Sequence, residues 1–282
     1  VLTENESEIL KDCERVISQF HDDSPNAMIK IALAPCSPFS VSNDLMSQTA
    51  VLARENHLCM HTHLAENSED VEYSLEKFKM RPGEYAESLG WLGDDVWHAH
   101  CVKLDSAEVK LFGKTNTGIA HCPSSNMRLA SGIAPLLEML ENNVRVGLGV
   151  DGSSSNDSGH MLNEARQAML LQRVKHSASV IGARDVLRTA TRGGAEVLRR
   201  ENIGQIAPGF MADIAIYDMH SVDLAGTHTD PLAALVFCGP IKTTHTIING
   251  NLVVKHGQLT TMDVNALLQK HRKLSVDLVN SA

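Results

Sequence analysis

The chain has 282 residues, of which 43% are hydrophobic and 21% are charged. A chain of this length and composition can bury a substantial core, which argues against a disordered or fibrous protein and predicts one large domain with a small appendage. Its formal charge of -9 leaves no basic stripe for phosphates, which argues against a nucleic-acid or anionic-membrane partner and favours a small neutral substrate.

The cysteines and the first residues indicate the cellular compartment. Six cysteines are scattered along the chain without a CxxC pair, a pattern typical of reduced thiols in the cytoplasm. The opening residues, "VLTENESEIL", have neither a basic start nor an apolar run, and no later stretch approaches the length of a membrane span. We therefore expect a cytoplasmic protein without a membrane segment.

Short apolar runs alternate with helical patterns through the first two thirds of the chain. The run "MIKIALAP" at 28–35 predicts a buried strand, and 42–56 predicts a helix capped by Ser42. Further strands are expected within 58–63, 95–101, 117–123 and 145–152, with a helix near 133–143 among the intervening segments. Strand, helix and strand in series indicate a parallel sheet with helices over its faces.

Each of these five predicted strands ends in a residue that could take part in catalysis. These residues are Cys36, His63, His100, His121 and Asp151. In a (β/α) barrel the active site lies at the carboxyl ends of the strands. The pattern therefore predicts an α/β fold with a TIM-like barrel rather than an open sheet.

The sequence changes character near residue 204. Asn249 and Gly250 stand at the turn of a predicted hairpin in "THTIINGNLVVKHGQL", and "DVNALLQKHRKLSVDL" predicts a final helix. We therefore divide the chain into a barrel portion at 1–203, a small β portion at 204–262 and a helix at 263–282.

His63 and Asp151 are the candidate metal ligands. Imidazole nitrogen and carboxylate oxygen suit zinc or iron, and both residues follow predicted strands. Taken singly, His63 could be a hydrogen-bonded core histidine and Asp151 a turn cap. Their recurrence at successive strand ends favours the metal site.

Glu66 is the candidate general acid or base. It lies just past His63, from where a carboxylate can reach a water or a ring nitrogen without binding the metal. The alternative is a glutamate of the first helical turn, a role that Glu69 and Asp70 fit better.

Three other strand-end residues are candidates for supporting roles. His100 could polarise a substrate oxygen or stabilise an attacking hydroxide, whereas His98 would be structural. His121 could support the site from behind or form a core hydrogen bond, and Cys36 is expected to line the pocket.

Five ordered motifs between Ala34 and Leu259 resemble the amidohydrolase superfamily. Within it they are most similar to the 8-oxoguanine deaminases, a group with relatives among the hydroxydechloroatrazine ethylaminohydrolases. The motifs are "HTHLAE", "WHAHCVKL", "AHCPSSNMRL", "GLGVDGSSSNDSGHM" and "TRGGAEVLRRENIGQIAPGFMADIAIYD".

The resemblance implies a role for each matching residue. His63 is similar to the metal-binding histidine of the fifth barrel strand, and Asp151 to the eighth-strand aspartate that binds the metal and takes a proton from the water. Glu66 matches the proton-transferring glutamate, and His100 the sixth-strand histidine that orients the water. Cys36 stands where related deaminases contact the substrate. The implied cofactor is one divalent metal ion, Zn²⁺ or alternatively Fe²⁺.

The family also has a first-strand His-x-His pair of metal ligands, which this sequence lacks. The resemblance therefore implies the C-terminal portion of the enzyme: strands four to eight of the barrel with a small β-sandwich portion. The implied reaction is deamination of 8-oxoguanine to urate in a homo-oligomer. The alternatives are another heterocyclic substrate, such as a hydroxytriazine or guanine, and a catalytically incomplete fragment.

Overall fold

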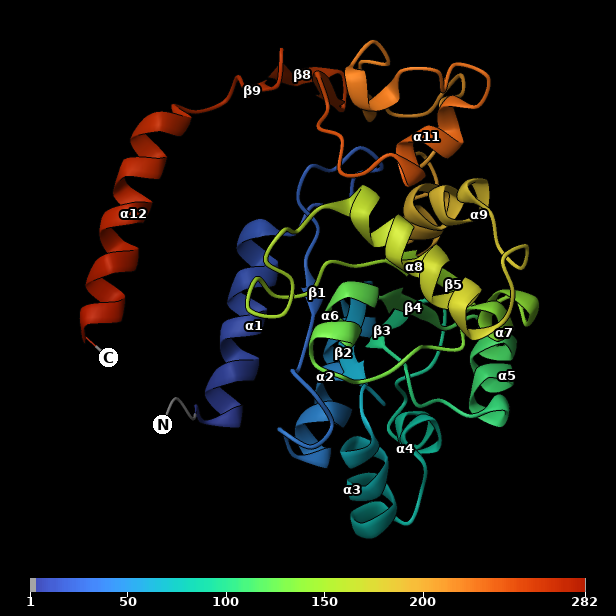
Figure 1. The fold of residues 1–282 in the computed structure, drawn as a ribbon. Coiled ribbons are helices and arrows are strands. Elements are labelled where there is room, and N and C mark those ends of the chain that lie inside the picture. The colour runs from blue at the N-terminus through green and yellow to red at the C-terminus, as the bar shows by residue number, and fades with distance from the viewer. Residues whose placement is uncertain (1–3, 282) are drawn as a thin grey trace.

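The computed structural model describes residues 4–281 and contains two separate sheets (Figure 1). The strands of the first sheet are β1 (Ala32–Leu33), β2 (Cys59–Leu64), β3 (Val96–His100), β4 (Gly118–His121) and β5 (Arg145–Leu148). Those of the second are β6 (Ile214–Ile216), β7 (His245–Ile248), β8 (Asn251–Lys255) and β9 (Gln258–Leu259).

Helices precede, connect and follow these strands. The α-helices are α1 (Glu6–Phe20), α2 (Asn43–Glu55), α3 (Ser68–Phe78), α4 (Pro82–Ser88), α5 (Ser106–Thr115), α6 (Pro123–Arg128), α7 (Leu136–Glu141), α8 (Met161–Lys175), α9 (Ala183–Arg188), α10 (Gly194–Val197), α11 (Pro231–Phe237) and α12 (Val264–Ser281). A π-helical turn, η1 (Thr189–Gly193), joins α9 to α10, and a 3₁₀ turn, η2 (Val222–Leu224), follows β6.

The first sheet has the strand order β1-β2-β3-β4-β5, and every neighbouring pair is parallel. Parallel neighbours require crossover connections, and helices supply them here. Ser42 caps α2 as predicted, since its hydroxyl accepts a hydrogen bond from the Leu45 N–H. The expected α/β class with a parallel sheet is confirmed.

The prediction of a buried strand over the whole of 28–35 was wrong. Only Ala32 and Leu33 pair with β2, while Met28 and Ile29 are 58% and 56% exposed. β1 is one of the two edge strands of the sheet, and these earlier residues lie outside its short pairing with β2.

The core lies between one face of the sheet and the helices. Along β2 buried and half-buried residues alternate, because successive side chains point to opposite faces of a strand. One buried cluster contains a residue from each of four neighbouring strands, Met60, Val96, Ile119 and Val146, together with Phe112 of α5. His63 lies on the other, less covered face of β2.

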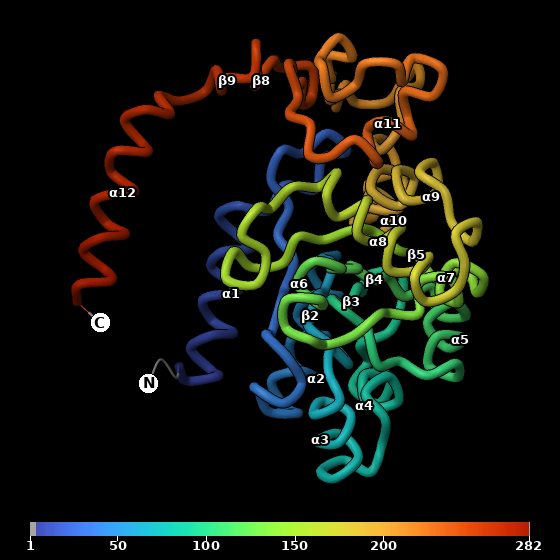
Figure 2. The backbone as a smooth tube through the Cα atoms, in the orientation of Figure 1, coloured from blue at the N-terminus to red at the C-terminus, as the bar shows by residue number. Residues whose placement is uncertain are grey.

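The second sheet is antiparallel, with a hairpin between β7 and β8 at the predicted turn. It lies apart from the first sheet, and α12 extends away from it (Figure 2). A helix was expected in this last segment, but none of the residues of α12 is buried. Among residues 4–281, no helix is both long and apolar enough to cross a lipid bilayer.

Candidate active site

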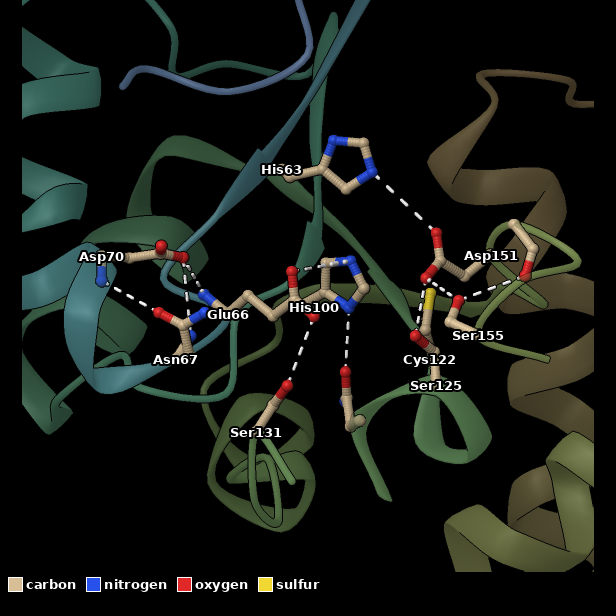
Figure 3. A network of polar contacts seen from close by, with 12 residues as sticks. His63, Glu66, Asn67, Asp70, His100, Cys122, Ser125, Ser131, Asp151 and Ser155 are labelled. Carbon is tan, nitrogen blue, oxygen red and sulfur yellow. Dashed lines mark hydrogen bonds and ion pairs between the residues drawn. The ribbon is translucent and has the colours of Figure 1, made fainter. Parts of the chain in front are cut away.

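The candidate side chains gather at the carboxyl end of the parallel sheet, where three residues have left-handed backbone (Figure 3). Ala65 follows β2, His100 ends β3 and Asp151 follows β5, and their φ angles are 49°, 69° and 62°. Left-handed backbone is unfavourable for residues with a Cβ and costs about 1–3 kcal/mol at each position. Such strain is found preferentially at functional sites, and here it turns the chain where the candidate side chains gather.

His63 is oriented by the backbone of the neighbouring loop. Its Nδ1 lies 2.5 Å from the carbonyl oxygen of Cys36, which can only accept, so Nδ1 carries the proton. The unprotonated Nε2 then faces Asp151, with 4.0 Å between Nε2 and Oδ1. This is the arrangement expected of a histidine prepared to bind a metal ion.

Asp151 is held through one of its two oxygens. Oδ2 accepts hydrogen bonds from the Ser125 and Ser155 hydroxyls at 2.6 Å and 2.7 Å. The other oxygen, Oδ1, faces His63. Burial alone would raise the pKa of Asp151, but these bonds, the Gly152 N–H and the charge of His100 together lower it. Asp151 is therefore a carboxylate at neutral pH.

His100 and Glu66 form the second half of the cluster. His100 is 1% exposed, and its Nδ1 lies 2.8 Å from Oδ1 of the fully buried Asn126. Its Nε2 lies 3.6 Å from Glu66 Oε2, while Glu66 Oε1 accepts a hydrogen bond from the Ser131 hydroxyl at 3.3 Å.

Glu66 itself lies outside the helix that follows it. Asn67 caps α3, and its capping box with Asp70 satisfies the first N–H groups of the helix. Glu69 and Asp70 are the acidic residues of the first turn, as expected. Glu66 is thus not needed to stabilise α3, and its side chain turns towards His100.

The ring and carboxylate atoms fit a divalent cation. His63, His100 and Asp151 each offer one ligand atom within 4.8 Å of the others. Two nitrogens and a carboxylate oxygen are a donor set suited to zinc or iron. Asp151 Oδ1 and His63 Nε2, which lie 4.0 Å apart, could each supply a ligand atom to such an ion. The sequence had grouped only His63 and Asp151 as ligands.

Among the described residues, the side chains of the other predicted residues form no hydrogen bond to this cluster. Cys36 is exposed and touches His63 only through its carbonyl oxygen. His98 points into the core, where its Nε2 donates to the Trp91 carbonyl oxygen at 2.9 Å and burial lowers its pKa to about 3. His121 is also buried, but neither ring nitrogen has a partner among the described residues, and burial lowers its pKa to about 4.

Sequence reasoning missed four residues that hold the candidate side chains. Ser125 and Ser155 contact Asp151, Asn126 contacts His100, and Ser131 contacts Glu66. The only available signal was the clustering of serine and asparagine after two strand ends, in "AHCPSSN" and "GSSSND". These residue types are equally common in ordinary turns, so the clusters alone assigned no role.

A cavity lies at the opposite end of the parallel sheet, where the strands begin. It has a volume of about 1250 Å³ and is lined at the strand starts by Cys59, Trp97 and Arg145. None of His63, Glu66, His100 and Asp151 lines it. The convergence of ionisable groups therefore locates the candidate active site, and the size of the cavity does not.

The chain belongs to the amidohydrolase family, whose model matches residues 1–253. It is 42% identical over 271 residues to the 8-oxoguanine deaminase of Pseudomonas aeruginosa, an alignment that covers 96% of this chain and 60% of that protein. It is 35% identical to the hydroxydechloroatrazine ethylaminohydrolase of Pseudomonas sp. (strain ADP), with 93% of this chain and 55% of that protein covered. The resemblance inferred from the motifs is confirmed at the level of the family.

Solved structures agree with these relationships. The crystal structure of an atrazine chlorohydrolase from Arthrobacter aurescens TC1 complexed with zinc superimposes with a TM-score of 0.91 at 31% identity. The superposition covers 96% of this chain and 60% of that protein. In each of these comparisons the chain spans 55–60% of the length of the relative.

Proposed function

We propose that the enzyme represented by this chain deaminates a purine-like ring by metal-dependent hydrolysis. The proposed reaction converts 8-oxoguanine and water to urate and ammonia. The observation that carries the proposal is the convergence of His63, Glu66, His100 and Asp151 from the ends of three parallel strands. The 42% identity to an 8-oxoguanine deaminase supports this substrate.

In this proposal the chain holds the ion and moves the protons. His63 Nε2 and Asp151 Oδ1 would hold a divalent ion, Zn²⁺ or alternatively Fe²⁺. A bound ion of this kind lowers the pKa of a water and makes it a stronger nucleophile. Asp151 accepts a proton from the attacking water, and His100 orients that water towards the amino-bearing carbon.

Glu66 completes the proton transfer. Its carboxyl group donates a proton to a ring nitrogen as the water adds, and the proton that Asp151 took from the water passes to the departing amine. Glu66 regains a proton from the added hydroxyl as the carbonyl group forms. The C–N bond then breaks and ammonia leaves. Ser131 bonds Glu66 Oε1, so the oxygen on the side of His100 is Oε2.

We also propose a more specific architecture. The five parallel strands correspond to strands four to eight of a (β/α) barrel within 1–203, and 204–262 to a β-sandwich portion, followed by the helix at 263–282. The strand order, the parallel pairing and the match to 60% of the zinc-complexed structure support this assignment.

Metal analysis combined with an ammonia-release assay tests the proposed function. About one bound equivalent of zinc or iron and ammonia release from 8-oxoguanine are expected. A hydroxytriazine and guanine should be assayed in parallel, because the relatives include a hydroxydechloroatrazine ethylaminohydrolase. Faster release from either compound would replace the proposed substrate. Metal binding without ammonia from any of the three would contradict deamination, and absence of both would indicate a catalytically incomplete chain.

A further inference from the structure

Two consecutive residues of α6 reach different members of the candidate site. Ser125 donates to Asp151, and Asn126 contacts His100, although Asp151 and His100 come from different strands. Both α6 side chains are fully buried. Pro123 starts the helix directly after β4, so this first turn lies at the carboxyl end of the sheet.

The contact between Asn126 and His100 determines which ring nitrogen carries the proton. A carbonyl oxygen accepts hydrogen bonds and cannot donate them, so Asn126 Oδ1 requires a proton on His100 Nδ1, 2.8 Å away. In the neutral ring the other nitrogen, Nε2, is then an acceptor. That nitrogen faces Glu66 Oε2 at 3.6 Å.

His98 provides an internal contrast on the same strand. Its Nε2 lies 2.9 Å from the carbonyl oxygen of Trp91, so Nε2 must carry the proton. His98 and His100 therefore have opposite tautomers, and each is set by a single buried oxygen.

We propose that Asn126 is a positioning residue that holds His100 as the Nδ1–H tautomer, so that Nε2 accepts a hydrogen bond from the attacking water. The role in orienting water rests on the proposed function, whereas the tautomer rests on the structure alone. Accepting this O–H directs a lone pair of the water towards the ring carbon.

Nitrogen NMR of the histidine rings tests the tautomer directly. The full chain is labelled with ¹⁵N-histidine, freed of metal by a chelator and measured at alkaline pH, where imidazoles are neutral. His100→Gln and His98→Gln assign the two rings by the loss of one spin system each. We expect the proton on Nδ1 of His100 and on Nε2 of His98. A proton on Nε2 of His100 would overturn the proposal.

Variants of α6 test whether Asn126 causes this preference. Asn126→Ala should shift His100 away from the Nδ1–H form, whereas Asn126→Asp should retain it, because a carboxylate also accepts from Nδ1–H. Ser125→Ala is the matched control, since Ser125 contacts Asp151 and should leave the His100 spectrum unchanged. Retention of the Nδ1–H form in Asn126→Ala, or its loss in Asn126→Asp, would contradict the positioning role.

These outcomes are separable from the proposed function. An Nδ1–H tautomer without ammonia release would leave the Asn126 assignment intact and count against deamination. Ammonia release with an Nε2–H tautomer would support deamination and overturn the Asn126 assignment. If Asn126→Ala does not fold, the wild-type spectrum and the isosteric Asn126→Asp still decide the question.

Discussion

His63 Nε2 and Asp151 Oδ1 face each other at 4.0 Å across the carboxyl end of the parallel sheet. The opposite side of each group is already bonded, His63 through Nδ1 to Cys36 and Asp151 through Oδ2 to two serines. Each group is thus held through one atom, while His63 Nε2 and Asp151 Oδ1 face each other. This relationship leads to the first prediction.

Removing the Asp151 carboxylate should weaken metal binding. We expect Asp151→Asn to lower zinc affinity at least about tenfold, equivalent to about 1.4 kcal/mol, because a neutral amide oxygen is a weaker ligand than a carboxylate. Competition with a chromogenic chelator measures the change. Asp157→Asn is the control, since Asp157 is exposed and pairs with Arg128 instead. Equal zinc affinity for both variants would exclude Asp151 as a ligand.

Glu66 should be required for turnover without being required for the metal. Glu66→Gln removes the transferable proton, so ammonia release should fall about 10²- to 10⁴-fold while the bound metal stays the same. Metal analysis and the ammonia assay on one preparation separate the two effects. Glu69→Gln, in the first turn of α3, should retain activity. Loss of metal in Glu66→Gln would show that Glu66 is a ligand.

The hydrogen bond from Ser125 should make stability depend on pH. The lowered pKa of Asp151 contributes stability that is complete above the ordinary aspartate value of about 3.9 and is lost as the pH falls through the folded-state pKa. Ser125→Ala should cost about 1 kcal/mol at neutral pH, and this difference from the wild type should shrink below about pH 3.9.

Urea unfolding at several pH values measures this difference. Ser124→Ala is the matched control, because the neighbouring Ser124 hydroxyl is buried without a partner among the described residues and its removal breaks no hydrogen bond. A Ser125→Ala deficit that stays constant through the acidic range would show that the effect does not act through Asp151.

Two adjacent glycines, where η1 ends and α10 begins, should differ in how an added methyl group changes the stability of the chain. A Cβ on Gly193 would lie 2.1 Å from the Val146 carbonyl oxygen, whereas a Cβ on Gly194 would meet nothing within 4 Å. Gly193→Ala should therefore destabilise the chain by about 1–3 kcal/mol. Gly194→Ala should be neutral or stabilising by up to about 1 kcal/mol, because alanine favours helix. Equal melting temperatures would contradict this close packing of η1 on β5.

The positions of four of the five parallel strands followed from the sequence because each combines an apolar run with polar residues at its end. β1 did not, since the length of an edge strand depends on pairing with a neighbour, which a local pattern does not record. His98 shows the same limit. Strict alternation would align it with His100, but the left-handed backbone at His100 redirects that side chain out of the strand pattern.

The candidate site was predictable only in part. His63, Glu66, His100 and Asp151 could be selected because ionisable groups at strand ends are unusual residues in a recurring place. The residues that hold them could not. Asn126 lies 2.8 Å from His100 only because α6 starts directly after β4, a relation between elements that spacing in the sequence does not reveal.

The absence of buried residues in α12 has a consequence for the cooperativity of unfolding. An isolated helix of 18 residues is marginal in water, and no residue of α12 is buried, with Leu278 and Val279 more than 70% exposed. We therefore expect α12 to unfold independently of the parallel sheet. In hydrogen exchange, the amides of α12 should show little protection, while those of β3 and β4 should exchange only through global unfolding. Removing α12 should leave the unfolding midpoint of the remaining chain unchanged.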